Sequence, residues 1–250
     1  MSSNTISNLV PIVDFSCRDG KLWDTTMLDC RLQVIPFDST TDFTYVVDLV
    51  GESIGLVSIQ DNRKPLVVDL NTTRKNIGRS DLLIRAIGHK SKVVIDSTAG
   101  IGKDAMQIVM SGRQVVMIER DPVVSLLLKD GLRRISKQPF ADRITLLCGD
   151  SIDFLGKITA DAVYLDPMFE KTHKSALPGR DLQYLRDLLE TDQDLVQLVT
   201  YARDKYRRVV VKRAAKGPAI MEDVTQVFMG KTVRYDVYIN SNSKSAVKVE

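Results

Sequence analysis

The chain has 250 residues, the length of one large domain or of a full-sized domain with a small appendage. Hydrophobic residues make up 44% of it and charged residues 27%, values that exclude disorder and collagen-like repeats. Thirty-five Lys and Arg against 32 Asp and Glu leave a net charge of +3, which neither requires nor excludes a nucleic-acid partner.

The three cysteines, Cys17, Cys30 and Cys148, form no C-x-x-C pair, so the sequence encodes neither a disulfide framework nor a zinc cluster. We therefore expect no metal. No apolar run approaches the roughly 20 residues that a membrane span needs. The polar start of the chain also lacks the features of a secretory leader, and we expect a cytoplasmic protein with no membrane partner.

The N-terminal part of the chain carries short β-branched runs separated by turn residues. These runs include Tyr45–Val47, Leu56–Ile59 and Leu66–Val68. The pattern is typical of an antiparallel meander. We therefore predict a small β-rich N-terminal subdomain over residues 1–70 and a second, larger domain over residues 71–250.

In the larger domain, strand-like apolar runs alternate with stretches whose apolar residues recur every three or four positions. That alternation predicts βαβ units and a mostly parallel sheet. The expected strands are Val93–Asp96, Val115–Glu119, Ile144–Cys148, Ala162–Asp166 and Val209–Lys212. The expected helices are 82–87, Lys103–Met110, Val123–Ile135 and one or two within Leu182–Tyr201. The last two strands, close enough in sequence to pair antiparallel, are Val227–Phe228 and Tyr235–Ile239.

The carboxyl ends of parallel strands are the places where α/β proteins bind ligands. The first strand of this domain runs into Asp96 and then into Gly100 and Gly102, which open the next helix. Glycines let the backbone turn tightly and approach a ligand, which suits a nucleotide-like cofactor. A plain strand-to-helix turn is the other interpretation of the same pattern.

The next two strands also end close to an acid. Glu119 lies at about the spacing from the glycines at which one carboxylate meets both hydroxyls of a ribose. It is equally compatible with a solvated acid before a helix that starts near Pro122. Asp150 could accept a hydrogen bond from an adenine amine, although a helix cap is the better interpretation for this residue alone.

The fourth strand ends in Asp166-Pro167-Met168-Phe169, the most informative run in the chain. Proline removes a backbone donor and leaves carbonyl oxygens and the Asp166 carboxylate as acceptors beside an aromatic ring. Such acceptors can bind the N–H groups of an exocyclic base amine and favour the pyramidal nitrogen that attacks a methyl group. Phe169 would stack on the base. We predict Asp166, Pro167 and Phe169 as the catalytic group; an Asp-Pro turn followed by a core aromatic residue is the alternative.

Taken in chain order, these features resemble the class I S-adenosylmethionine-dependent methyltransferases. Longer runs are similar to the RsmJ family of bacterial small-subunit ribosomal RNA guanine-N2 methyltransferases. They are DSTAGIGKDA at 96–105, ERDPVV at 119–124, VYLDPMF at 163–169 and VVVKR at 209–213. The resemblance implies an α/β fold, with a Rossmann-like methyltransferase sheet over residues 71–250 whose last strand is antiparallel. It also implies S-adenosyl-L-methionine as the methyl donor.

Carried over position by position, the resemblance adds contacts to those suggested by the strand ends. The residues predicted to bind S-adenosylmethionine are Asp96, Gly100, Gly102, Lys103, Asp104, Glu119, Arg120, Asp150, Ser151 and Asp166. Basic residues flank the same strand ends and could hold RNA phosphates around a target base, although such runs are more often solvated surface. The residues predicted to bind RNA are Arg74, Lys75, Arg79, Lys171, His173, Lys174, Lys212 and Arg213.

The sequence thus favours methylation of the exocyclic N2 amine of a guanine in 16S ribosomal RNA, with small-subunit RNA or the 30S subunit as the partner. Two alternatives stay open. Gly100-x-Gly102 followed by Glu119 also satisfies the dinucleotide fingerprint of an NAD-linked dehydrogenase. A non-catalytic, RNA-binding ribosome assembly factor could also use a methyltransferase scaffold.

Overall fold

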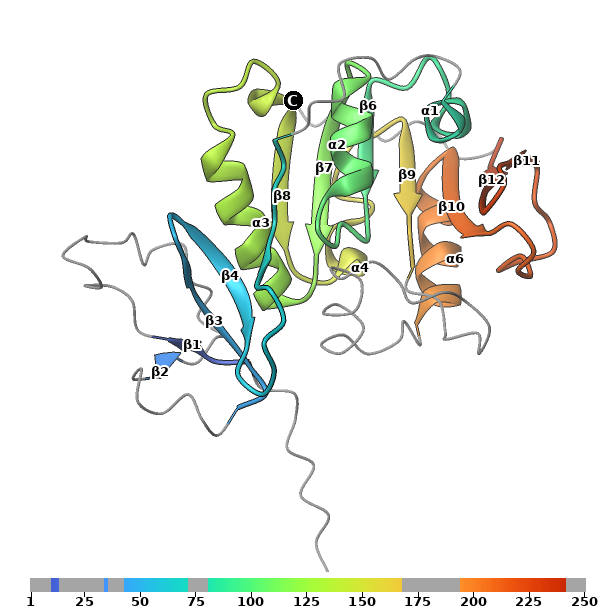
Figure 1. Cartoon of the computed structure of the whole chain (residues 1–250). Coiled ribbons are helices and arrows are strands. Elements are labelled where there is room, and N and C mark those ends of the chain that lie inside the picture. Colours follow the sequence, from blue (N-terminus) through green and yellow to red (C-terminus); the bar gives the residue numbers. More distant parts are fainter. Residues whose placement is uncertain (1–9, 14–33, 36–42, 72–80, 168–193, 242–250) are drawn as a thin grey trace, which may run out of the picture. The chain divides into compact units, whose positions relative to one another are not determined.

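Figure 1 shows the computed structural model of the chain, which describes residues 10–13, 34–35, 43–71, 81–167 and 194–241. The chain forms two compact units, and we describe each by itself. The first unit combines the N-terminal strands with residues 121–134 from the middle of the chain, and the second contains the larger sheet. A single division at residue 70 does not account for the segment 121–134, and the predicted domain boundary stays a prediction.

The first unit contains a five-stranded sheet in the order β2-β1-β3-β4-β5. Its strands are β1 (Ile12–Val13), β2 (Val34–Ile35), β3 (Tyr45–Val50), β4 (Ser53–Ser58) and β5 (Leu66–Val67). Strands β3, β4 and β5 pair antiparallel, which is the predicted meander. Strand β1 instead pairs in parallel with both β2 and β3, an arrangement that the sequence pattern did not predict.

Helix α3 (Pro122–Arg134) belongs to the first unit, where it is joined to β4 through a buried carboxylate. Asp130 is 0% exposed and accepts a hydrogen bond from the backbone N–H of Ile54, at 3.1 Å. Arg133 and Arg134 donate to the two oxygens of the same carboxylate, at 2.8 and 2.9 Å. The buried charge is therefore fully compensated by partners from its own helix and from the strand.

The second unit contains a seven-stranded sheet in the order β11-β12-β10-β9-β6-β7-β8. The strands are β6 (Val93–Asp96), β7 (Gln114–Glu119), β8 (Ile144–Cys148), β9 (Ala162–Leu165), β10 (Arg208–Ala214), β11 (Gln226–Met229) and β12 (Val233–Ile239). Strands β6 to β10 are parallel, whereas β12 pairs antiparallel with both β10 and β11. The predicted fold class, a mostly parallel sheet with an antiparallel end, is confirmed.

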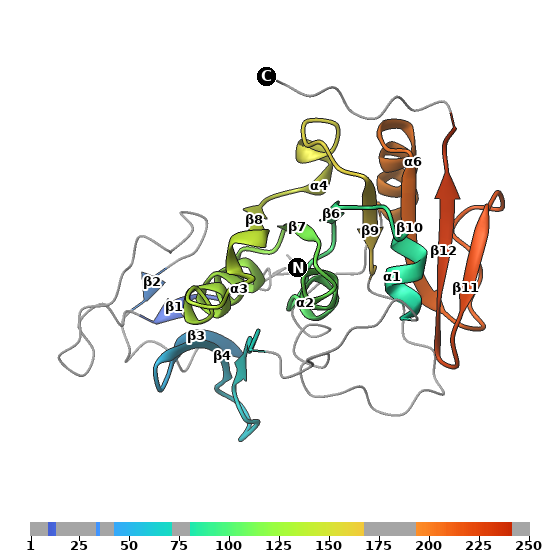
Figure 2. The same ribbon diagram turned by 90° about the horizontal axis from the view of Figure 1, so that it is seen from above.

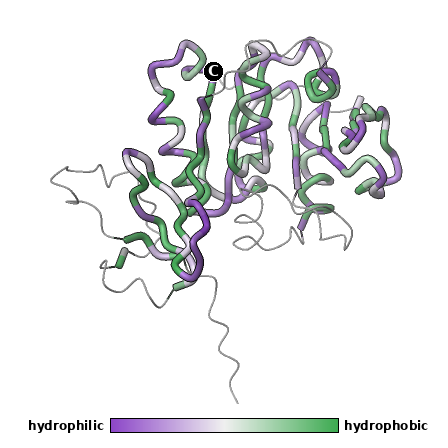
Figure 3. The backbone as a smooth tube through the Cα atoms, in the orientation of Figure 1, coloured by the Kyte–Doolittle hydropathy of each residue, from purple (hydrophilic) through white to green (hydrophobic). Residues whose placement is uncertain are grey.

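Helices of this unit lie on both faces of the sheet, as the view in Figure 2 shows, with α1 and α2 on one face and α6 on the other. The helices are α1 (Leu82–Ile87), α2 (Lys103–Met110), α4 (Ser151–Phe154) and α6 (Leu195–Lys205). On the α6 face, Leu198, Val199 and Ala202 pack with alternate strand residues such as Ile95 and Val163. Figure 3 shows the hydrophobic residues concentrated along the central strands that these helices cover.

Most predicted elements of this unit match the structure within two residues. The helix predicted within Leu182–Tyr201 corresponds to α6, which begins at Leu195 and ends at Lys205, beyond the predicted end at Tyr201. The earlier part of that prediction, up to residue 193, lies outside the described residues. Strand β9 ends at Leu165 instead of Asp166. The backbone N–H of Asp166 donates to the Thr98 hydroxyl at 2.6 Å instead of to a neighbouring strand, so the strand pairing ends at that point.

Candidate active site

The candidate site lies at the carboxyl edge of the large sheet, where the chain leaves β6. The neighbours of β6 are β7 on one side and β9 on the other, so the connections diverge at this strand. The Ser97 N–H donates to the Tyr164 carbonyl, and the Ala99 N–H donates to the Ile118 carbonyl. The segment after β6 is therefore held between its two neighbours, at the switch point where α/β sheets bind ligands.

Two glycines give this segment its shape. Gly100 and Gly102 have φ angles of 52° and 76°, in the left-handed region that glycine adopts without a steric penalty. The Gly102 N–H donates to the Ala99 carbonyl at 2.8 Å, and α2 begins at the next residue. A Cβ at Gly100 would meet nothing closer than the Thr98 carbonyl at 4.0 Å, so the backbone there faces open space that a ligand can approach.

Glu119, at the end of β7, is 6% exposed and is not the solvated acid of the alternative interpretation. Its Oε2 accepts the Gly100 N–H at 2.8 Å, which places the carboxylate against the glycine turn. The helix that follows is capped by Asp121, whose Oδ1 accepts the Val123 N–H at 2.9 Å. A buried carboxylate beside the turn fits the geometry needed to bind a ribose.

Asp150 and Ser151 follow β8 and begin α4. The Oδ1 of Asp150 accepts the Ile152 N–H at 2.9 Å, so Asp150 caps this helix as its local sequence favours. The Ser151 hydroxyl donates to the Ser97 carbonyl at 2.7 Å. These contacts fix the third strand end beside the first, and an additional contact of Asp150 with an adenine stays a prediction.

Asp166 and Pro167 follow β9 directly, and Lys212 from β10 reaches the Asp166 carboxylate. The Lys212 Nζ lies 2.8 Å from Oδ2 of Asp166 and 2.8 Å from Oδ2 of Asp104, in the first turn of α2. The Tyr164 hydroxyl also donates to Oδ2 of Asp104. The predicted acceptor group is thus joined by hydrogen bonds to the helix that follows the glycine turn.

Two carboxyls at this edge have raised pKa values. Burial, followed by the nearby Asp104 carboxylate, raises the pKa of Asp96 well above its ordinary value. Burial also raises the pKa of Asp166 to about 6, although the Lys212 ammonium opposes the shift. A positively charged ligand at the turn would favour the ionised form of both carboxyls.

The other predicted donor-binding and RNA-binding residues differ in their surroundings. Lys103 is exposed at the start of α2. Arg120 forms an ion pair with Asp194 at 3.1 Å. Arg213 is buried and donates Nε to the Pro218 carbonyl at 3.0 Å, so it lies on the face of β10 opposite to Lys212.

Seven predicted site residues lie outside the described part of the chain. They are Arg74, Lys75, Arg79, Phe169, Lys171, His173 and Lys174. Their predicted roles in base stacking and RNA binding therefore stay predictions. Three further residues of the site were not predicted from the sequence. Thr98 binds the Asp166 N–H, Tyr164 binds Asp104, and Tyr235 on β12 lies opposite Lys212. The run Tyr164-Leu165-Asp166 placed Tyr164 two residues before the acceptor, on the same face of the strand, and could have indicated it.

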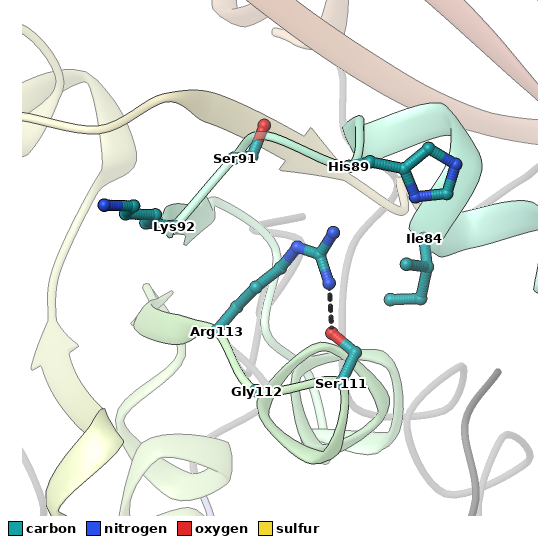
Figure 4. A pocket seen from close by; sticks show the side chains of 7 residues that line it. All are labelled: Ile84, His89, Ser91, Lys92, Ser111, Gly112 and Arg113. Atoms are coloured by element: carbon teal, nitrogen blue, oxygen red, sulfur yellow. Dashed lines mark hydrogen bonds between the residues drawn. The ribbon is translucent and has the colours of Figure 1, made fainter. Parts of the chain in front are cut away.

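A separate cavity of about 360 Å³ lies at the opposite, amino edge of the sheet (Figure 4). It is lined by Ile84, His89, Ser91, Lys92, Ser111, Gly112 and Arg113. Arg113 donates to the Ser111 hydroxyl at 2.6 Å and to the Gly88 carbonyl at 3.1 Å. Its charge therefore compensates the carbonyl ends of α1 and α2, and the cavity is distant from the strand ends that carry the acids.

Within the described residues, no group of three or more His, Cys, Asp or Glu is arranged to hold a metal ion. Among the described helices, none is long and apolar enough to cross a membrane.

The sheet order, the glycine turn and the acids at the strand ends define a class I S-adenosylmethionine-dependent methyltransferase. A family model described as "Putative SAM-dependent methyltransferase" matches residues 33–240. The crystal structure of a SAM-dependent methyltransferase from Neisseria gonorrhoeae has the same fold, with a TM-score of 0.67 and 24% identity. That match covers 93% of this chain and 97% of the Neisseria chain.

Relatives in sequence narrow the class to one family. The ribosomal RNA small subunit methyltransferase J of Coxiella burnetii is 35% identical over 229 residues, which are 84% of this chain and 88% of the relative. The protein of the same name from Marinobacter nauticus is 41% identical over 175 residues, 64% of this chain and 63% of the relative, less than two thirds of its length. This chain belongs to the family of ribosomal RNA small subunit methyltransferase J. The dehydrogenase and assembly-factor alternatives have no support in these comparisons.

The acidic edge of the sheet fits S-adenosylmethionine, the methyl donor of this family. The donor carries a positive sulfonium and a positive amino group. These charges would favour the ionised form of Asp96, whose pKa is raised by burial and by the neighbouring Asp104 carboxylate. Glu119 offers a buried acceptor for a ribose, and Gly100 leaves the backbone open to close approach.

Proposed function

We propose that this protein transfers the methyl group of S-adenosylmethionine to the exocyclic N2 amine of a guanine in 16S ribosomal RNA. Its relatives carry the name ribosomal RNA small subunit methyltransferase J, which supports small-subunit RNA as the substrate. The substrate is then free 16S RNA or the 30S subunit, and the protein works in the cytoplasm, where ribosomal subunits are made.

The donor binds along the carboxyl edge, over the ends of β6, β7 and β8. S-adenosylmethionine supplies an electrophilic methyl group on its sulfonium. Glu119 accepts from the ribose hydroxyls, while Gly100 and Gly102 let the backbone come close to the donor. Asp150 accepts from the adenine amine through its second carboxylate oxygen, because Oδ1 caps α4. The remaining proposed donor contacts are Asp96, Lys103, Asp104, Arg120 and Ser151.

The target base binds beside Asp166, and the fixed position of this residue is the observation that carries the proposal. The Thr98 hydroxyl accepts its backbone N–H at 2.6 Å, and Lys212 binds its carboxylate at 2.8 Å. The Asp166 carboxylate and the Pro167 carbonyl accept the two N–H groups of the guanine amine, which favours the pyramidal nitrogen that attacks the methyl group. Phe169 stacks on the base.

A guanine must leave its stack to reach Asp166, which costs a few kcal/mol. Phosphate contacts offset this cost. We assign those contacts to the basic residues that precede β6 and follow β9 in sequence, namely Arg74, Lys75, Arg79, Lys171, His173 and Lys174.

The test is to incubate the purified protein with radiolabelled S-adenosylmethionine and 30S subunits from cells that lack the methyltransferase, and then to map the methylated base. We expect one labelled guanine, methylated on N2. Asp166→Ala removes the acceptor and should abolish incorporation, while binding of S-adenosylmethionine is weakened or kept. The matched control is Asp142→Ala, which removes an exposed acid before β8 at the amino edge and should behave like wild type. The absence of label in wild type, or a label on another base or atom, would contradict the proposal.

A further inference from the structure

Two predicted RNA contacts, Lys212 and Arg213, lie in the described part of the chain, and of these two Lys212 reaches the carboxyl edge of the sheet. The pairing of β10 with β9 sets Val211 opposite Leu165, and therefore brings the next residue, Lys212, alongside Asp166. The pairing of β10 with β12 sets Lys212 opposite Tyr235. Because side chains alternate along a strand, Lys212 shares the face of Tyr164 and Asp166.

The ammonium of Lys212 is held by two carboxylates from different elements. Its Nζ lies 2.8 Å from Asp104 Oδ2 and 2.8 Å from Asp166 Oδ2, and the three side chains are 20%, 21% and 32% exposed. The Tyr164 hydroxyl donates to the same oxygen of Asp104. The Lys212 ammonium therefore already binds two carboxylates within the site, which makes it a poor contact for an RNA phosphate.

We propose that Lys212 is a positioning residue for the methyl acceptor: its bridge from Asp104 to Asp166 holds the Asp166 carboxylate ionised and aimed at the target amine. The proposal rests on the proposed function, since Asp166 must accept from that amine. The bridge also connects Asp166, beside which the base binds, to α2, which begins at the glycine turn where the methyl donor binds. The two substrates therefore contact one hydrogen-bonded group of residues.

The charge balance explains why the ammonium is needed. Burial raises the pKa of Asp166 to about 6, the Lys212 ammonium lowers it, and Asp104 raises it. Without Lys212 the pKa of Asp166 would rise further, so more of the carboxyl would be protonated at neutral pH and it would be a weaker acceptor for the amine. The titratable groups that face Asp166 from the surrounding described elements are Asp96 on β6, Asp104 on α2, Tyr164 on β9, Lys212 on β10 and Tyr235 on β12.

The experiment compares Lys212→Met and Lys212→Arg with wild type in methyl transfer to 30S subunits, at saturating S-adenosylmethionine, from pH 5.5 to 9. We expect Lys212→Met to lower kcat at pH 7 by roughly 100-fold, mainly because Asp166 is no longer aimed at the amine. A rise of about one unit in the pKa of Asp166, from about 6, accounts for only about a twofold loss at pH 7. Its KM for the subunits should change little. The acid limb of kcat should move to higher pH by about one unit, and Lys212→Arg should restore much of the wild-type profile. Lys205→Met is the matched control, because Lys205 pairs with Asp204 at 2.7 Å beyond the other edge of the sheet.

An NMR titration of the Asp166 carboxyl carbon gives a readout that does not depend on activity. We expect the pKa of Asp166 to be higher in Lys212→Met than in wild type, and calorimetry should show that S-adenosylmethionine still binds. An unchanged acid limb with an unchanged pKa of Asp166 would overturn the proposal. So would a defect confined to KM for the subunits, which would make Lys212 a phosphate contact. If the wild-type protein is itself inactive, the proposed function is wrong. In that case an unshifted pKa of Asp166 in Lys212→Met would also reject the role of Lys212 in ionisation.

Discussion

Replacement of Glu119 by alanine should weaken binding of S-adenosylmethionine by about 100-fold or more. The carboxylate is 6% exposed and already faces the glycine turn. Hydrogen bonds to a charged group contribute about 1.5–3 kcal/mol each, so the loss of two ribose contacts costs about 3 kcal/mol at the low end. Each 1.4 kcal/mol is about tenfold in Kd, which gives the expected factor.

Alanine has a second effect at this position, because Glu119 Oε2 accepts the Gly100 N–H at 2.8 Å. An N–H that loses its partner in a buried setting costs about 1–3 kcal/mol, so the glycine turn should also become less stable. Glu119→Gln keeps one acceptor oxygen. That oxygen can accept from the Gly100 N–H or from a ribose hydroxyl, whereas the carboxylate has two oxygens and can accept from both. We expect the Kd of Glu119→Gln to rise about tenfold, between those of wild type and alanine.

Isothermal titration of S-adenosylmethionine into each variant measures these affinities, and thermal unfolding without ligand measures the effect on the turn. Glu222→Ala removes an exposed carboxylate from the loop after β10 and is the matched control. If Glu119→Ala binds within threefold of wild type, the assignment of Glu119 to the ribose is wrong. Equal losses in Glu119→Ala and Glu119→Gln would instead mean that the full charge is required.

Three further predictions follow from other parts of the structure. Gly102→Ala, at a φ of 76°, should lower the free energy of unfolding by about 1–2 kcal/mol in urea titrations and weaken donor binding, whereas Gly217→Ala, whose φ is not positive, should do neither. Asp130→Ala leaves the buried Ile54 N–H without its acceptor and removes the partner of Arg133 and Arg134, and should cost about 1–3 kcal/mol in the same assay; a loss below 1 kcal/mol would show that water replaces the carboxylate. The wild-type kcat should fall as the pH drops through about 6, since Asp166 then gains a proton; a rate that rises on acidification would contradict its role as an ionised acceptor.

The local periodicity of the sequence was sufficient to predict most of the large sheet. Helix Lys103–Met110 has the predicted bounds because Gly102 starts it and its apolar residues recur on one face. The acid after β6, the acid that ends β7 and the Asp-Pro pair after β9 were also visible in the sequence, because ligand-binding residues of parallel sheets follow the strands directly.

Longer-range pairings required the fold. Lys212 and Arg213 are adjacent and both basic, so they have the same predicted role. In the structure Lys212 binds Asp166, whereas Arg213 is buried on the opposite face of β10 and binds the Pro218 carbonyl. Tyr235 comes opposite Lys212 only through the register of β12. Likewise, the parallel pairing of β1 and the grouping of residues 121–134 with the N-terminal strands have no local signal.

The sequence by itself therefore determined the class of sheet, the positions of the strand ends and the kinds of side chain that gather there. The tertiary structure decided which of those side chains meet, and with them the charge and pKa of Asp166. The physical reason is that helix and strand periodicity depends on neighbouring residues, whereas an ion pair such as Lys212 with Asp104 depends on strand order and register between segments that are distant in the chain.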